Sequence, residues 1–219
     1  MEALKKADYK TTKVPDKIVI KRVLNGEKEL FEILMRRYNP MLYRAVRSYL
    51  KVEDDVEDTM QDSYLKAFNK LHQFNHNASF STWLVRIGIN EALQKIRKHS
   101  NVQPINGIQN ETDIPSSENN TMNPEKQAIQ NETCRLLEKA IDQLPEKYRV
   151  IYILREIEGM DNKTISECLE LTEGNVKVRF YRSKKMLKEK LYEFTDDAEL
   201  FGFRDTRCDR LVENVMKKI

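Results

Sequence analysis

The side chains best suited to binding chemistry lie near the end of the sequence, where lysine and arginine recur among apolar residues. The apolar residues at positions 176, 180, 187 and 191 have helical spacing and predict one buried helix face. Cationic groups on the remaining surface could reach the phosphates and base edges of DNA, whose major groove admits one helix. The polar side chains on or beside that surface are Lys177, Arg179, Tyr181, Arg182, Lys184, Lys185 and Lys188.

A second helix predicted just before the basic one completes a DNA-binding motif. Asp161 and Thr172 are suitable caps for helices over 162–169 and from 173 to about 194. Ser166 supplies the small side chain needed where two such helices cross closely. A basic helix alone is more often a solvated surface, whereas the pair predicts a helix-turn-helix that recognises DNA.

Aromatic and basic side chains are interleaved in a second segment, 80–98, which follows a polar loop. Single-stranded nucleic acid is held by stacking on aromatic rings and by cations along its backbone, and an extruded base needs a polar pocket. Phe80 and Trp83 are the aromatic candidates, although each could equally be a core residue, and the two uses can coexist. The loop residues available for a pocket are Phe74, Asn75, His76, Asn77 and Ser79.

No group of side chains has the spacing of a catalytic or metal site. The histidines have no cysteine partners nearby, and the aspartates of the acidic run lack the loop glycine of a calcium site. The three cysteines are widely spaced, which favours reduced thiols over a disulfide framework, with Cys168 a small buried hydrophobe. We therefore expect no enzymatic activity, no cofactor and no bound metal. The residues considered are His72, His76, His99, Asp54, Asp55, Asp58, Cys134, Cys168 and Cys208.

Composition places the protein in a helix-rich globular class. The chain has 219 residues, 40% of them hydrophobic and 33% charged, with six glycines, which suffices for two small domains that each bury a core. No apolar run approaches the roughly 20 residues that span a bilayer, and no secretory signal precedes the chain's helices. We therefore expect a cytoplasmic location without membrane insertion. The net charge of +3 is unevenly distributed, so different surfaces should meet different partners.

Helical periodicity interrupted by polar segments predicts an all-α protein with two small helical domains joined by a flexible linker. Residues 17–98 form the first predicted domain and residues 125–194 the second. The linker is the segment 99–124, which is rich in Asn, Ser, Thr, Pro and Gly. Residues 1–16 are an N-terminal extension. Residues 195–219 are an amphipathic C-terminal extension, which could pack on the second domain or make a regulatory contact.

A predicted helix over 55–71 has an acidic and amide-rich surface. Taken alone, such a surface is most often simply solvated. The residues that point away from its apolar stripe are Glu57, Asp58, Gln61 and Asp62. The stripe itself consists of Val56, Met60, Ser63, Ala67 and Leu71.

Three motifs, in this order, resemble the extracytoplasmic-function (ECF) sigma factors of the sigma-70 family. They are Asp55-x-Glu57-Asp58-x-x-Gln61-Asp62, Phe80-x-x-Trp83-Leu84-x-x-Ile87-x-x-Asn90, and the stretch from Leu144-Pro145 to Leu191. Each motif alone is moderately specific, but their joint order is highly specific and covers nearly the whole chain. The resemblance implies an alternative sigma factor whose regions 2 and 4 bind core RNA polymerase, recognise the promoter −10 and −35 elements, and promote melting and transcription initiation.

The resemblance also implies partners and residues for each site. Core RNA polymerase would be bound through its β′ clamp helices and β flap, promoter DNA as double and single strands, and an anti-sigma factor is a further candidate partner. The implied polymerase-binding residues are Asp55, Asp58, Gln61, Asp62 and Leu65. The implied −10 residues are Phe74, Asn75, His76, Asn77, Ser79, Phe80, Trp83, Asn90, Lys95, Arg97 and Lys98. The implied −35 residues are Glu173, Asn175, Lys177, Val178, Arg179, Tyr181, Arg182, Lys184 and Lys185.

Three residues depart from the family pattern, and two other function classes have different requirements. Gln94 stands where an acid is common, Asn175 where threonine is common, and Glu170 where the turn often has glycine. Glu170 would cost about 1 kcal/mol if its φ is positive. A helix-turn-helix regulator that binds an operator without polymerase would not need the acidic surface. A nuclease or deaminase would need a metal cluster or a paired acid and base.

Overall fold

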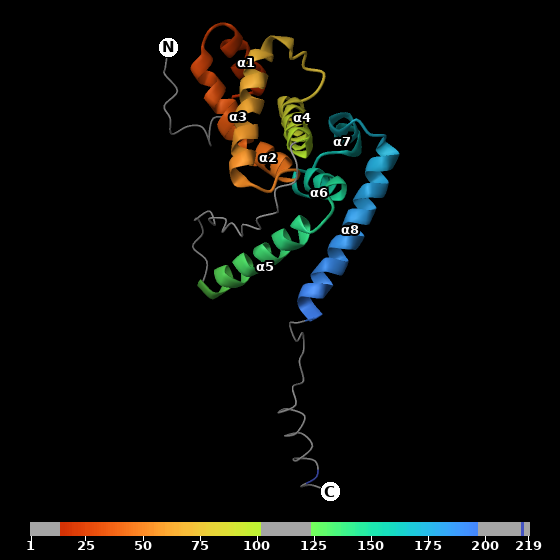
Figure 1. The fold of residues 1–219 in the computed structure, drawn as a ribbon. Helices are drawn as coiled ribbons and strands as arrows, with labels where there is room; N and C mark the ends of the chain where they lie inside the picture. Colours follow the sequence, from red (N-terminus) through yellow and green to blue (C-terminus); the bar gives the residue numbers. More distant parts are fainter. Residues whose placement is uncertain (1–13, 102–123, 197–215, 217–219) are drawn as a thin grey trace. The chain divides into compact units, whose positions relative to one another are not determined.

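A computed structural model of the chain describes residues 14–101, 124–196 and 216 (Figure 1). Every secondary-structure element within those residues is helical, which confirms the predicted all-α class. Most of the predicted N-terminal extension, linker and C-terminal extension lies outside the described residues. Among the described helices, none combines the length and apolar character needed to cross a bilayer.

The helices follow one another in two runs along the chain. The first run consists of α1 (Asp16–Leu24), the 3-10 turn η2 (Lys28–Leu30), α2 (Phe31–Arg47), α3 (Glu53–Asn69), the 3-10 turn η3 (Leu71–Gln73) and α4 (Phe80–Asn101). The second run consists of α5 (Pro124–Asp142), α6 (Glu146–Tyr152), the π-helical segment η4 (Ile153–Ile157), α7 (Asn162–Leu169) and α8 (Glu173–Asp196).

The chain divides into two compact units, each built from two separate stretches of sequence. The first unit contains Met1–Glu118 and Leu144–Lys184, and the second contains Asn119–Gln143 and Lys185–Ile219. Helices α1 to α4, α6, α7 and the first half of α8 therefore belong to the first unit. The domain boundaries at 17–98 and 125–194 follow the sequence motifs instead and stay a prediction.

Helices α2, α3 and α4 pack on one another around an apolar core, which positions the acidic surface predicted on α3 and the loop before α4. Leu34, Leu42, Val56 and Leu84 belong to this cluster and have no exposed surface. The stripe predicted for α3 is confirmed, because Val56, Ser63, Ala67 and Leu71 are buried and Met60 is partly buried. Burial of this stripe leaves the other side of α3 available to partners.

A second apolar cluster in the first unit packs the helix-turn-helix against neighbouring helices. Leu154, Ile165 and Val176 are fully buried in this cluster. It also includes Val85 of α4, against which α7 packs. Cys168 is buried here as predicted, and burial raises the pKa of its thiol to about 11, so the thiol stays protonated at neutral pH.

Gly88 allows α4 to lie unusually close to α2. A Cβ atom at this position would lie 2.5 Å from Leu42 Cδ1 and 3.3 Å from Val46 Cγ2. Both of those side chains are fully buried, so neither can move aside without disturbing the core. The absence of a side chain at position 88 therefore sets how closely the two helices approach.

Gly88→Ala should lower the free energy of unfolding by about 1 kcal/mol, because overpacking costs about 1–3 kcal/mol and improved helix propensity returns about 1 kcal/mol. Gly174→Ala on α8 is the matched control, since the nearest atom to its added Cβ would be Thr172 Oγ1 at 4.0 Å. Urea denaturation of both variants tests this expectation. Equal stabilisation by both substitutions would show that α2 and α4 accommodate the extra carbon.

Candidate nucleic-acid interface

An acidic surface on α3 contains the residues that the first motif singled out. Asp58, Gln61 and Asp62 are exposed, and Asp55 is half-buried. Leu65 lies on the same helix with 64% of its surface exposed. The helix thus presents acids, an amide and an apolar side chain to solvent, as a surface that binds another protein would.

A mostly apolar groove of about 460 Å³ adjoins this surface between α2 and α3. Its apolar lining consists of Phe31, Met35, Met60, Tyr64, Leu65 and Phe68, and its polar lining of Asn39, Glu57 and Gln61. Gln61 and Leu65 were predicted site residues, whereas the groove between the helices was not predicted. The signal was the i, i+4 spacing of its apolar members on each helix.

Lys95 of α4 reaches back to the acidic surface. Its Nζ lies 2.8 Å from a carboxylate oxygen of Asp55 and 3.3 Å from one of Asp58. Burial alone would lower the pKa of Lys95, but hydrogen bonds and the negative charges of Asp55 and Asp58 outweigh it and raise the pKa. An expected DNA-binding cation is therefore paired with two expected polymerase-binding acids.

The polar loop before α4 exposes its predicted pocket residues together. Asn75, His76, Asn77 and Ser79 are all exposed, and Phe74 is half-buried. The backbone nitrogen of Asn77 donates to Asn75 Oδ1 at 3.2 Å, and His76 has a φ of 60°. This positive φ and the Asx-type hydrogen bond give the loop a tight turn.

Ser79 caps α4, because its Oγ accepts a hydrogen bond from the backbone nitrogen of Thr82 at 3.1 Å. Phe80 is only 2% exposed, and its ring lies 5.8 Å from the rings of both Phe74 and Trp83, between centroids. Phe80 is therefore a core residue, which decides between the two uses that its sequence allowed. Trp83 is half-buried and keeps some surface for a ligand.

A basic groove of about 410 Å³ lies along α3, η3 and α4. It brings together three predicted residues, Trp83, Asn90 and Arg97, whereas Lys95 and Lys98 do not line it. The groove is also lined by residues that were not among the predicted −10 residues, namely Lys66, Lys70, Gln73, Arg86, Ile87, Glu91, Leu93 and Gln94. Lys66 lies on α3 and Lys70 at its C-terminal cap, four residues later, and this spacing was the available signal.

The helix-turn-helix forms where the sequence predicted it, with the predicted caps. Asp161 Oδ1 accepts a hydrogen bond from the backbone nitrogen of Thr164 at 2.7 Å, and this bond lowers the pKa of Asp161. Thr172 Oγ1 accepts one from the backbone nitrogen of Asn175 at 3.2 Å. Helix α7 therefore begins at Asn162 and α8 at Glu173, as expected.

Helix α8 exposes its basic side as the apolar spacing predicted. Val176 and Leu187 are buried, whereas Val178 is 49% exposed and Tyr181 is 73% exposed. Among the predicted −35 residues, Arg179 is half-buried, and the exposed ones are Glu173, Asn175, Lys177, Val178, Tyr181, Arg182, Lys184 and Lys185. Lys184 Nζ lies 3.6 Å from Glu156 and 5.4 Å from the centre of the Phe180 ring. One helix face therefore combines cations, an aromatic ring and an apolar side chain.

Glu170, in the turn between α7 and α8, has a φ of 54°. This left-handed conformation costs a residue with a Cβ roughly 1 kcal/mol relative to glycine, so the departure noted in the sequence carries the expected strain. The Glu170 side chain lies 2.9 Å from Arg86, but it is 73% exposed and this ion pair stabilises little.

Glu170→Gly should raise the free energy of unfolding by about 1 kcal/mol, because glycine adopts the left-handed conformation without steric cost. Glu170→Ala removes the same carboxylate but keeps the Cβ, so it should leave stability nearly unchanged. Thermal denaturation of the two variants separates backbone strain from loss of the ion pair. Equal stabilities would show that the turn does not strain residue 170.

Two family descriptions match the chain. Sigma-70 region 2 matches residues 34–102, which include most of α2 and all of α3 and α4. Sigma-70 region 4 matches residues 134–187, which include α7 and the first part of α8. The ECF RNA polymerase sigma-E factor of Haemophilus influenzae is 28% identical over 180 residues, covering 80% of this chain and 95% of its relative. The same factor of Escherichia coli K12 is 27% identical over 184 residues, covering 80% and 94%.

Solved structures share the fold over most of their length. The sigma factor RpoE from Bartonella quintana, in complex with the anti-sigma factor NepR, is 22% identical with a TM-score of 0.58, covering 74% of this chain and 96% of that one. CnrH, in complex with the cytosolic domain of CnrY, is 24% identical with a TM-score of 0.55, covering 84% and 99%. The chain belongs to the ECF sigma factors of the sigma-70 family, which are non-enzymatic factors for transcription initiation.

Proposed function

We propose that three surfaces of this sigma factor each bind a different partner during transcription initiation. The acidic surface of α3 binds core RNA polymerase, the loop before α4 and the basic groove bind the melted −10 element, and α8 binds the −35 element. The observation that carries this proposal is that α3 presents an acidic surface beside an apolar groove shared with α2, and lines a separate basic groove with a tryptophan that it shares with α4. One small bundle thus offers chemically different surfaces to protein and to nucleic acid.

The polymerase partner proposed for the acidic surface is the pair of β′ clamp helices. Asp58, Gln61 and Asp62 supply charge and amide contacts, and Asp55 supports them from its half-buried position. Exposed Leu65 borders the apolar groove, which can receive apolar side chains from the partner. The polymerase β flap is the proposed partner of region 4.

Melted DNA is the proposed ligand of the loop and the basic groove. Asn75, His76, Asn77 and Ser79 offer donors and acceptors for the edge of an extruded base, whose unstacking costs a few kcal/mol. Trp83 offers a stacking surface, and Asn90 and Arg97 line the groove along which the strand would run. Lys98 is exposed beyond that groove, and Lys95 supplies charge once released from its acids. Phe74 and Phe80 support the loop from within the bundle.

Duplex DNA at the −35 element is the proposed ligand of α8. Lys177, Tyr181 and Arg182 are placed to contact base edges, and Val178 can contact only an apolar group such as a thymine methyl. Arg179, Lys184 and Lys185 are assigned to phosphates, and Glu173 and Asn175 lie at the start of the helix.

The proposed setting is the cytoplasm, where polymerase and promoter DNA are found. An anti-sigma factor is a further proposed partner, because RpoE and CnrH were each solved in complex with another protein, NepR and CnrY respectively. Such a partner would compete with polymerase if it covered the acidic surface or the apolar groove of α3.

Reversing two charges of the acidic surface tests the polymerase contact. Asp58→Lys with Asp62→Lys should lower the affinity for bacterial core RNA polymerase by about tenfold or more, because like charges would then face the partner. Co-elution in gel filtration measures this. Glu189→Lys with Glu193→Lys is the control, since it makes the same change in net charge on α8, where both acids form exposed ion pairs. If only the control lost co-elution, the assignment of the docking surface would be wrong.

Substitutions on α8 should separate base contacts from phosphate contacts. Arg182→Ala should weaken binding to a duplex enriched from a random pool by about 1–3 kcal/mol and relax preference at one position. Lys184→Ala should weaken binding to all duplexes and lower the slope of log affinity against log salt by about 1. Fluorescence anisotropy at several salt concentrations measures both. Sequence preference that survives Arg182→Ala would exclude the proposed base contact.

A further inference from the structure

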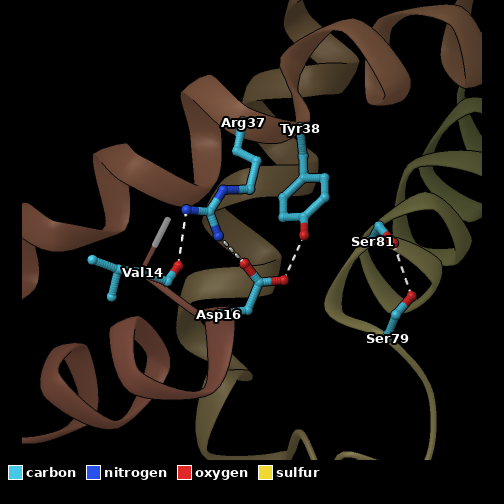
Figure 2. Close-up of polar contacts among 6 residues, drawn as sticks. All are labelled: Val14, Asp16, Arg37, Tyr38, Ser79 and Ser81. Carbon is cyan, nitrogen blue, oxygen red and sulfur yellow. Dashed lines mark hydrogen bonds and ion pairs between the residues drawn. The ribbon is translucent and has the colours of Figure 1, made fainter. Parts of the chain in front are cut away.

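The N-terminal end of α1 is tied to α2 through the carboxylate of Asp16. That carboxylate accepts hydrogen bonds from the Tyr38 hydroxyl and from the Arg37 guanidinium, which also donates to the carbonyl oxygen of Val14 at 3.0 Å (Figure 2). None of these residues belongs to the surfaces assigned above. The position of the Tyr38 ring is therefore held at its hydroxyl end by a charged acceptor.

The Tyr38 ring packs directly against the aromatic residues beneath the base-binding loop. Its centroid lies 5.6 Å from that of Phe80, which is buried and in turn contacts Phe74 and Trp83. Phe74 also contacts the His76 ring, with 4.6 Å between centroids. A continuous series of ring contacts therefore runs from Tyr38 to the loop.

The loop over 75–79 is connected to these rings near both of its ends. Near the first end, His76 has a left-handed backbone conformation, and its ring packs edge-to-face with that of Phe74. At the last end, Ser79 immediately precedes Phe80, and its Oγ lies 2.8 Å from Ser81 Oγ (Figure 2). The same Oγ lies 2.7 Å from Thr82 Oγ1. Movement of the Phe80 ring would therefore displace both ends of the loop.

The hydrogen bond to Asp16 persists throughout the physiological pH range. Burial, followed by the hydrogen bond and charge of Asp16, raises the pKa of Tyr38 to about 12. The hydroxyl consequently keeps its proton and continues to donate. Without an acceptor, a partly buried phenol would turn toward water and take its ring with it.

We propose that Asp16 and Tyr38 are positioning residues for −10 recognition: they hold Phe80 in place and thereby keep the loop in the shape that receives an extruded base. This inference rests on the proposed function of the loop. Asp16 and Tyr38 need not touch DNA, because their effect reaches the pocket through the contacts of Phe80 with Phe74 and Trp83.

Two substitutions remove this support with little change of shape. Tyr38→Phe deletes the hydroxyl and keeps the ring, and Asp16→Asn weakens the acceptor. Tyr43→Phe is the matched control, because Tyr43 lies on the same helix and also donates its hydroxyl to a carboxylate, that of Glu53, at 3.2 Å. All three variants should co-elute with core RNA polymerase as the wild-type chain does.

Trp83 reports the position of the rings directly, because it is the only tryptophan of the chain. In the free protein, Tyr38→Phe and Asp16→Asn should shift Trp83 emission to longer wavelength and increase its quenching by acrylamide. Tyr43→Phe should leave both signals unchanged. Unchanged signals in Tyr38→Phe and Asp16→Asn would overturn the proposal, whatever the loop binds.

DNA binding supplies the second measurement. A random pool of single-stranded oligonucleotides is enriched on wild-type holoenzyme, and affinities for the enriched sequence and the starting pool are compared. Tyr38→Phe should lower affinity for the enriched sequence about threefold to tenfold, with affinity for the pool unchanged. An equal loss for both would indicate a general structural defect and overturn the positioning role, as would no loss at all. If the wild-type holoenzyme enriches no sequence, the proposed function of the loop is wrong, and the positioning role that rests on it is wrong too.

Discussion

The close packing of α4 on α2 at Gly88 is the constraint on which the nucleic-acid surface of region 2 depends. Helix α4 is capped by Ser79 of the polar loop and carries residues of the basic groove along its length. A shift of α4 by even part of a side chain would move the loop, Trp83 and Arg97 relative to α3. The buried stripe of α3 completes the same core, so core packing fixes the separation of the two grooves.

Helix α3 contributes to two surfaces of opposite character because its sequence changes along its length. Its first turns carry acids, which also suit the positive end of the helix dipole, and its later turns carry Lys66 and, just after the helix, Lys70. The acidic part adjoins the apolar groove shared with α2, and the basic part lines the groove shared with α4. A single helix can therefore present an acidic surface and a basic one while its remaining side is buried.

Features determined locally could be predicted from the sequence, and features determined by contacts between helices could not. Asp161 and Thr172 cap their helices as predicted because a cap depends on residues within one turn. The burial of Phe80 stayed undecided until its neighbours on other helices were known. Periodicity shows the apolar members of the groove on each helix but not that the two helices lie side by side, and it gives no signal for the contact between Asp16 and Tyr38.

The pairing of Lys95 with Asp55 and Asp58 lets the two surfaces of region 2 share one cation. A polymerase side chain that binds Asp58, as proposed, competes with Lys95 for that carboxylate. The displaced ammonium group would then be available to a DNA phosphate. Because linkage is reciprocal, DNA that attracts Lys95 would also free Asp58 for polymerase. Transfer of Lys95 from Asp58 to a DNA phosphate would thus favour the complex of sigma factor, polymerase and DNA over the complex of the sigma factor with either one alone.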